Sequence, residues 1–292
     1  MDLTSNLTID PTFDPDDSLD LVYEPLQILI AITSVASALA NLTVIYVILR
    51  FNILRTRCNL YLSNWALCNL LAMLFMPMWP NLSQEEWHYV AGCIWSEFYY
   101  GAAVGNFFFV LILLVDWLVM SLKRVTWCQK VHWYVMGVTW SITVGISVAS
   151  LTYCLLNWSY PLTQVCYLFT FLVIFIVIIV VFLVRLLMVN VLGRRSMLNS
   201  KVEPIVVGSF WMCWTPSWIL CYGQLFQLFY TTQTVEESFM CLAHSHGWIM
   251  LVLLIVCDKR FRVCLRGGLG IREDTETVQN GVNKEQQTVL LK

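Results

Sequence analysis

Two histidines are the first residues in this chain that suggest chemistry. His244 and His246 lie close together in an apolar segment, where a pair of imidazoles could bind a metal ion. No Cys or carboxylate partner is evident for them, so we interpret both as ordinary buried histidines. No glycine-rich phosphate loop and no hydrolytic triad stands out. We therefore predict that the chain is not an enzyme and holds neither a metal nor a cofactor.

A proline close to a tryptophan is the second chemical signal. Pro216 lies in an apolar segment and lacks the N–H that would continue a helical ladder, so a helix is expected to kink there. Trp214, two residues earlier, would then press on this hinge. The simpler alternative is a kinked helix that is packed by aromatic side chains.

The elements that must position these residues are membrane helices. The chain has 292 residues, of which 59% are hydrophobic and 12% charged, whereas about 25% charged residues is usual for a soluble domain. A membrane-spanning helix needs about 20 mostly apolar residues, and barrel strands would be shorter and alternate in polarity. We predict an all-α membrane protein, a seven-transmembrane helix bundle. Its spans are 26–49, 60–78, 94–122, 131–156, 165–184, 205–230 and 239–257.

The charges are divided between the two ends of these segments. All 17 Lys and Arg residues fall in alternate gaps, and the opposite end carries twelve acids and no basic residue. Because cytoplasmic loops retain Lys and Arg, we predict that the N-terminus lies outside and the C-terminus inside. The outer acids would attract a cationic ligand.

The predicted domain organisation follows from these spans. Residues 1–25 form an acidic extracellular tail, which we expect to be disordered until bound. Residues 26–257 form the bundle, 258–266 a short amphipathic helix at the inner leaflet, and 267–292 a cytoplasmic tail. The first residues are acidic and polar, so we predict no cleavable signal peptide.

Glycosylation motifs agree with this topology. Asn6, Asn81 and Asn157 begin Asn-x-Ser/Thr motifs on the predicted outer side, and a fourth motif, at Asn41, falls within a predicted helix. Two other classes of seven-helix or multi-helix protein fit less well. A retinal-binding receptor needs a Lys in the seventh segment, which has none, and no internal repeat suggests a transporter.

The sixth segment carries the first sign of a family. Its sequence Phe210-Trp-Met-Cys213-Trp214-Thr-Pro216 resembles the Phe-x-x-Cys-Trp-x-Pro motif of rhodopsin-like G-protein-coupled receptors. Asn41, the run 54–67 and Trp140 resemble the first helix, the first inner loop with the second helix, and the fourth helix of that family. The resemblance covers about residues 24–266.

Chemokine receptors are the nearest group by resemblance. The run Phe75-Met-Pro77-Met-Trp79 is similar to their Pro-Phe-Trp motif, and the run that begins at Lys201 is similar to their short third inner loop. His246 lies 15 residues before Phe261-Arg262, as a histidine does before a similar Phe-Arg in those receptors. The resemblance implies a basic protein ligand and a heterotrimeric G protein as partners, with membrane lipids and without nucleic acid.

The resemblance also implies particular site residues. It pairs Cys93 with Cys166 in an outer disulfide, and the alternative is two buried free thiols. Cys264 is a candidate for palmitoylation or an unmodified thiol. The ligand-binding set is Asp14, Asp16, Asp17, Trp79, Glu97, Tyr100, Trp214, Glu236 and Glu237. The signalling set is Asn41, Asn69, Asp116, Trp117, Phe210, Trp214 and Pro216.

The inner half departs from the family pattern. Asn69 stands where the family has an Asp that helps to hold sodium, and Asp116-Trp117-Leu118 stands for Asp-Arg-Tyr. Trp117 offers one N–H and no charge, whereas an Arg offers five donors in a fixed fork. Both the restraint on the inactive state and the contact to the G protein are therefore weakened. Asp116 either lies at the headgroup boundary or has a signalling role, with Lys123 and Arg124 as possible partners.

Two functional hypotheses follow. The first is a chemokine-receptor-like G-protein-coupled receptor with atypical signalling, constitutive or scavenging, in the plasma membrane as a multi-pass protein. Retained outer motifs with degraded inner ones resemble receptors carried by herpesviruses, for which the location is the host cell membrane. The alternative is a non-transducing membrane interaction protein that modulates host membrane proteins.

Overall fold

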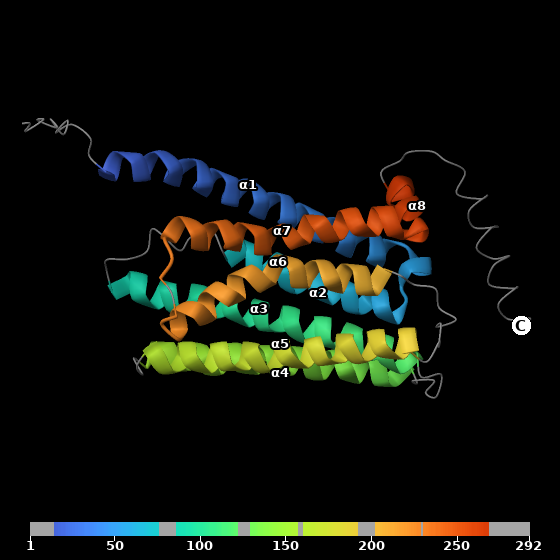
Figure 1. Cartoon of the computed structure of the whole chain (residues 1–292). Coiled ribbons are helices and arrows are strands. Elements are labelled where there is room, and N and C mark those ends of the chain that lie inside the picture. The colour runs from blue at the N-terminus through green and yellow to red at the C-terminus, as the bar shows by residue number, and fades with distance from the viewer. Residues whose placement is uncertain are drawn as a thin grey trace, which may run out of the picture.

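The structure is a computed structural model, and it describes residues 15–75, 86–121, 129–156, 160–191, 202–228 and 230–268. Within these ranges it contains helices and no strand, so the all-helical fold is confirmed (Figure 1). The long helices are α1 (Pro15–Arg50), α2 (Arg57–Phe75), α3 (Glu86–Ser121), α4 (Gln129–Leu155), α5 (Tyr160–Val191), α6 (Val202–Leu225) and α7 (Gln233–Cys257). A 3-10 turn, η1 (Asn52–Leu54), follows α1, and the short helix α8 (Lys259–Gly268) follows α7.

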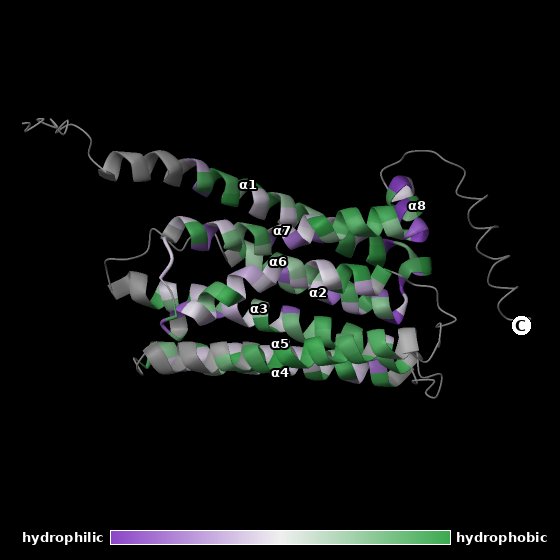
Figure 2. Cartoon of the chain, in the orientation of Figure 1, coloured by the Kyte–Doolittle hydropathy of each residue, from purple (hydrophilic) through white to green (hydrophobic). Residues whose placement is uncertain are grey.

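A segment that crosses a bilayer has no water to bond with, so its backbone N–H and C=O groups must form hydrogen bonds within the segment. A long apolar helix meets this requirement. Among the described residues, five helices are long and apolar enough to cross a membrane, with spans Pro25–Arg50, Val90–Val119, Val131–Leu155, Pro204–Gln224 and Thr234–Cys257. A shorter apolar stretch, Leu172–Val184, lies in α5. Figure 2 shows these hydrophobic residues along the length of the bundle. The chain is thus a helical membrane bundle.

The first helix begins earlier than the sequence pattern predicts. The expectation of a disordered tail is wrong from Pro15 onward, because α1 continues through Pro25 without a break. Proline is favoured in the first turn of a helix, because the backbone N–H groups there have no hydrogen-bond acceptor within the helix and a missing N–H costs nothing. Asp16 and Asp17 follow directly, and negative charge near a helix N-terminus is stabilising. Local preferences at this end therefore favour helix over coil.

The third helix is the centre of the bundle. It packs against α2, α4, α5 and α6, while α1 lies against α2 and α7, and α6 lies against α7. The largest fully buried side chains include Trp65, Phe107, Phe109 and Phe210, which come from three different helices. A polar bond joins α4 to α2, because the indole N–H of Trp140 donates to Asn64 Oδ1 at 2.8 Å.

A close approach between α1 and α7 depends on a glycine. A Cβ on Gly247 would lie 2.5 Å from Asn41 Nδ2 and 2.9 Å from Ser37 Cβ. In the same contact, the Ser37 hydroxyl donates to the carbonyl of His244. Asn41 Nδ2 donates to the carbonyl of Ser37 at 2.8 Å. Asn41 therefore belongs to the α1–α7 interface rather than to a glycosylation site.

The eighth helix lies against the ends of α1 and α7 (Figure 1). Asp258 precedes it and caps it, because Asp258 Oδ1 accepts from the backbone N–H groups of Arg260 at 2.8 Å and Phe261 at 3.1 Å. Phe261 and Cys264 are buried on its inner side, whereas Lys259, Arg260 and Arg266 are exposed. This is the short amphipathic helix that the sequence predicts after the seventh span.

Candidate functional site

Two residues of the proposed signalling set, Phe210 and Trp214, lie in a buried aromatic cluster. Trp214 and Phe210 lie one turn apart on α6, with ring centroids 5.9 Å apart. Phe107 of α3 makes edge contacts with Phe210 at 5.3 Å and with Trp214 at 6.1 Å. Such tilted and T-shaped pairs contribute about 0.5–1.5 kcal/mol each beyond the burial of apolar area. The cluster therefore fixes α6 against α3.

Two histidines extend the cluster to α7 and α2. The ring of His244 meets Trp214 edge-on at 5.9 Å, and His246 meets Phe210 edge-on at 5.3 Å. His246 also stacks on Trp65 of α2 at 4.9 Å. Both histidines are buried, which confirms their interpretation as buried histidines. No group of three or more His, Cys, Asp and Glu side chains suited to a metal occurs among the described residues.

Hydrogen bonds join the part of α6 after Pro216 to α7. Pro216 lies inside α6 and donates no N–H to the ladder. Next to it, the Ser217 hydroxyl donates to the carbonyl of Phe239 on α7 at 2.8 Å. Further on, Gln224 Nε2 and Thr231 Oγ1 donate to Glu236 Oε1, the latter at 2.9 Å. The half of α6 after Pro216 is therefore tied to α7.

The predicted outer acids have structural partners of their own. Glu236 accepts the two bonds just described, and Glu237 Oε2 accepts from Gln27 Nε2 of α1 at 2.9 Å. Glu97 is buried on α3, and the ring of Tyr100 packs edge-on against Tyr99 at 5.5 Å. These acids thus belong to the packing at this end of the bundle, whatever else they bind.

Tyr99 connects this end of the bundle to the cluster. Its hydroxyl lies 3.5 Å from His244 Nε2, within hydrogen-bonding distance. His244 in turn contacts Trp214. A continuous line of contacts therefore runs from Tyr100 through Tyr99 and His244 to Trp214.

Several predicted sites fall on residues that the structure does not describe. Asp14, Trp79 and the glycosylation candidates Asn6, Asn81 and Asn157 lie outside the described ranges, as do Lys123 and Arg124. The backbone of Asp16 and Asp17 is in the first turn of α1, without a described side chain.

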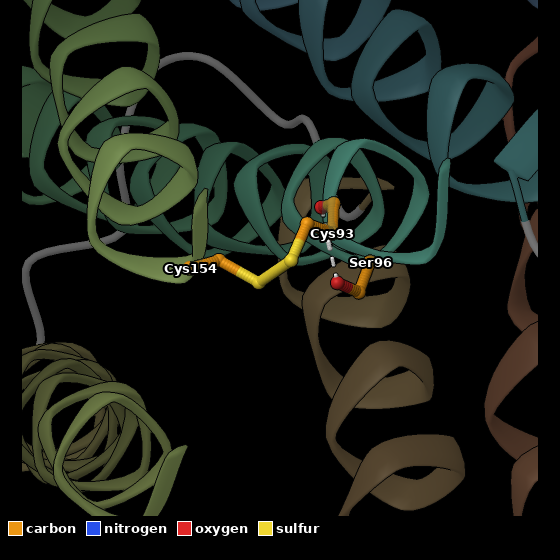
Figure 3. The surroundings of a disulfide bond; sticks show 3 residues. All are labelled: Cys93, Ser96 and Cys154. Carbon is orange, nitrogen blue, oxygen red and sulfur yellow. Dashed lines mark hydrogen bonds between the residues drawn. A yellow bond between two sulfur atoms is a disulfide. The ribbon is translucent and has the colours of Figure 1, made fainter. Parts of the chain in front are cut away.

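The predicted disulfide partner is wrong. The structure joins Cys93 of α3 to Cys154 of α4, with 5.8 Å between their Cα atoms (Figure 3). Cys154 lies in the last turn of α4, which brings it to the end of the bundle where Cys93 lies. The pairing with Cys166 assumed a loop, but α5 begins at Tyr160, so Cys166 lies within the helix. Ser96 Oγ donates to the carbonyl of Cys93 at 3.1 Å beside the bond (Figure 3).

The residues of the degraded inner motifs are placed as follows. Asp116 is buried, and its Oδ2 accepts from the thiol of Cys58 on α2 at 3.3 Å. Trp117 points to another neighbour, with its ring 6.5 Å from that of Phe182 on α5. Asn69 is buried, and its Nδ2 has no hydrogen-bond partner among the described residues. The Asp116 carboxylate is thus packed against α2.

Cys264, the candidate for palmitoylation, is buried between α8 and the bundle. Burial raises the pKa of the Cys264 thiol, and the nearby Asp258 carboxylate raises it further. The thiolate is the nucleophile in acylation, so this position is less reactive than an exposed thiol. Modification of Cys264 remains a prediction that requires α8 to move away from the bundle.

The aromatic cluster contains residues that the sequence analysis missed. Trp65 and Phe107 come from α2 and α3 and carry no motif of their own that marks them as neighbours of Trp214. The one available signal was the pair His244 and His246, which the sequence analysis set aside as ordinary core. Their role as ring partners becomes visible only once α6 and α7 are placed side by side.

Known proteins similar to this chain are chemokine receptors. The C-C chemokine receptor type 3 of Macaca fascicularis is 25% identical over 163 residues, which are 50% of this chain and 46% of the relative. That of Cavia porcellus is 30% identical over 101 residues, 33% of this chain and 28% of the relative. The probable C-C chemokine receptor type 3 of Mus musculus is 29% identical over 92 residues, 30% and 25% of the two chains. No protein-family model matches.

These matches cover part of each protein. The chain spans about half the length of the first of these curated relatives, 46%. The similarity, with the all-helical membrane bundle, confirms the resemblance to rhodopsin-like receptors nearest to chemokine receptors. It favours a receptor over an enzyme and a multi-pass membrane protein over a soluble one.

Proposed function

We propose that this chain is a chemokine-receptor-like G-protein-coupled receptor that binds a basic protein at its acidic end. The observation that carries the proposal is the buried contact of Trp214, Phe107 and His244, in which α3, α6 and α7 meet beside the Pro216 hinge. Similarity to C-C chemokine receptors supports a chemokine-like ligand. We propose the plasma membrane as its location, with the N-terminus outside.

The proposed signalling is atypical, either constitutive or scavenging. Support comes from the inner end, where Trp117 packs beside Phe182 and Asp116 accepts from Cys58. An Arg at position 117 would be able to form hydrogen bonds with carboxylates and carbonyls of neighbouring helices. The Arg at the corresponding position of the receptors that this chain resembles forms such a restraint. The indole ring provides packing without that charged restraint, so the inactive arrangement is held less tightly.

Restoring this Arg tests the proposal. Cells expressing the wild-type chain are expected to show G-protein activation without ligand, and Trp117→Arg is expected to lower it by up to about tenfold. This is the factor that one charge-assisted bond of about 1.5 kcal/mol provides. The measurement is ligand-independent G-protein activation at matched surface expression, with and without C-C chemokines.

Trp117→Phe is the matched control for that substitution. It retains a ring against Phe182 and adds no charge, so basal activation is expected to persist. Silent basal activity with ordinary agonist-dependent coupling, unchanged in Trp117→Arg, would contradict the proposal of atypical signalling.

We propose a second candidate function because Trp117, in place of an Arg, also weakens the contact to a G protein. A chain that no longer transduces would act as a membrane interaction protein that modulates other membrane proteins of the cell, or of a host cell. Precipitation with a panel of chemokines separates the two functions. Lack of any chemokine binding, together with loss of another surface protein on expression, would favour this second function.

A further inference from the structure

Among its described residues, the turn between α6 and α7 exposes three large apolar side chains. Phe226, Leu228 and Tyr230 have 63%, 74% and 87% of their surface exposed. No charged residue occurs between Leu225 and Gln233. Contiguous exposed apolar groups mark a surface that another phase or molecule covers. The ligand proposal does not account for this surface, because it rests on acids.

These side chains project from a fixed turn. The backbone N–H of Leu228 donates to the carbonyl of Gly223 at 2.8 Å, and that of Gln227 donates to the carbonyl of Gln224 at 3.0 Å. Gln227 adopts φ 54°, the left-handed conformation that commonly ends a helix. On the other side of the turn, the Thr231 hydroxyl donates to Glu236. The exposure of the apolar groups is therefore set by hydrogen bonds on both sides.

The direction of Phe226 follows from the helix before it. Met212 and Ile219 are exposed on α6, within the span Pro204–Gln224, so they belong to the face that lipid covers. Phe226 comes seven residues after Ile219, as Ile219 comes seven after Met212, and a spacing of seven keeps residues on nearly the same helical face. Phe226 thus continues the lipid-facing stripe, and its ring stacks on Tyr222 at 6.4 Å.

If the apolar spans of α6 and α7 cross a bilayer, the turn between them lies at the polar–apolar boundary. The span of α6 ends at Gln224 and that of α7 begins at Thr234, so the turn lies just beyond both ends. At 1.5 Å per residue, Phe226 lies about 3 Å past the end of the span. The interfacial layer on each side of the hydrocarbon is roughly 5–7 Å thick. Aromatic residues, with an apolar body and a polar tip in Tyr, are favoured at this depth.

We propose that Phe226, Leu228 and Tyr230 form an interfacial anchor that inserts into the phospholipid headgroup region and holds this end of α6 in the bilayer. The occupant is the lipid surface and not a protein ligand. The proposal requires only that the chain spans a membrane, so it is independent of the proposed receptor function. The three apolar side chains of the anchor are distinct from the acids of the proposed ligand-binding set.

Photo-cross-linking tests the anchor. The full chain is placed in phosphatidylcholine nanodiscs with benzoylphenylalanine at Tyr230, at Phe226 or at Leu228 in separate preparations, which covers the case that one substitution prevents folding. Benzoylphenylalanine at Ile219 is the lipid-facing reference. After illumination, mass spectrometry of peptides is expected to show the mass of one phosphatidylcholine added at the turn positions, with a yield comparable to that at Ile219.

Three results would overturn the anchor. One is a lipid adduct at Ile219 with none at the three turn positions. Another is capture of an added, labelled C-C chemokine by the turn in place of lipid, which would make it a ligand surface. The third is cross-linking of the turn only to other parts of the chain. Absence of chemokine binding to the wild-type chain would bear on the receptor proposal alone.

Discussion

A Cys154→Ser variant is expected to be much less stable than the wild-type chain, whereas Cys166→Ser is expected to leave stability unchanged. The bond from Cys93 to Cys154 closes a loop of 61 residues, and the loss of loop-closure entropy for that length corresponds to about 4 kcal/mol at most. Because unfolded helices remain inserted in the bilayer and are already restricted, we expect about 2 kcal/mol, the lower end of the usual range.

The measurement is the thermal unfolding of purified protein in nanodiscs, with peptide mapping under non-reducing conditions. Cys93→Ser is the matched control, and its effect is expected to equal that of Cys154→Ser, with no further loss in the double variant because both remove one bond. A destabilising Cys166→Ser with a silent Cys154→Ser would show that the disulfide uses the other partner.

Replacing Gly247 by alanine is expected to destabilise the bundle by about 1–3 kcal/mol, the usual cost of overpacking a tight contact. The added methyl group would lie 2.5 Å from Asn41 Nδ2 and 3.2 Å from the carbonyl oxygen of Ser37. The second of these atoms is backbone, so it cannot move aside by changing a rotamer. We expect α1 to shift away from α7 and the bond from Ser37 to the His244 carbonyl to weaken.

Gly208→Ala is the matched control for this prediction. Gly208 is also within a helix, but a Cβ at that position has no heavy atom within 4 Å. Alanine is a better helix former than glycine, so this variant is expected to be as stable as the wild type or more so. Thermal unfolding in nanodiscs compares the two, and equal stability of both variants would contradict a tight α1–α7 contact at Gly247.

The fold followed from the sequence because length and apolar character are local properties. Each span is a continuous apolar run, and each of the seven long helices overlaps one of them. Three spans lie wholly within a helix, and the predicted ends of the other four lie one to five residues past the helix. The start of α1 was missed because acidic residues near Pro15 were weighed as a sign of disorder, although the same residues stabilise a helix N-terminus. Composition and position therefore gave opposite indications for the same acids.

The site was predictable only in part, since its contacts join residues that are far apart in the chain. Trp214, Phe210 and Pro216 were found because a motif marks them. Phe107 and Trp65 were not, because their approach to α6 depends on how helices pack. The Cys166 pairing came from resemblance alone, and resemblance does not report where α4 ends or α5 begins.

Pro216 divides α6 into two arms: hydrogen bonds hold the arm after it to α7, and the ring contacts of Phe210 and Trp214 hold the arm before it. The Ser217 hydroxyl and Gln224 join the arm after the hinge to α7, so that arm and α7 form one unit. The other arm begins at Val202 and is about 14 residues, or about 21 Å, long. A tilt of about 10° at the hinge would displace its far end by about 4 Å. A small rearrangement of rings around Trp214 is thereby amplified at the end of the bundle where Asp116 and Trp117 lie.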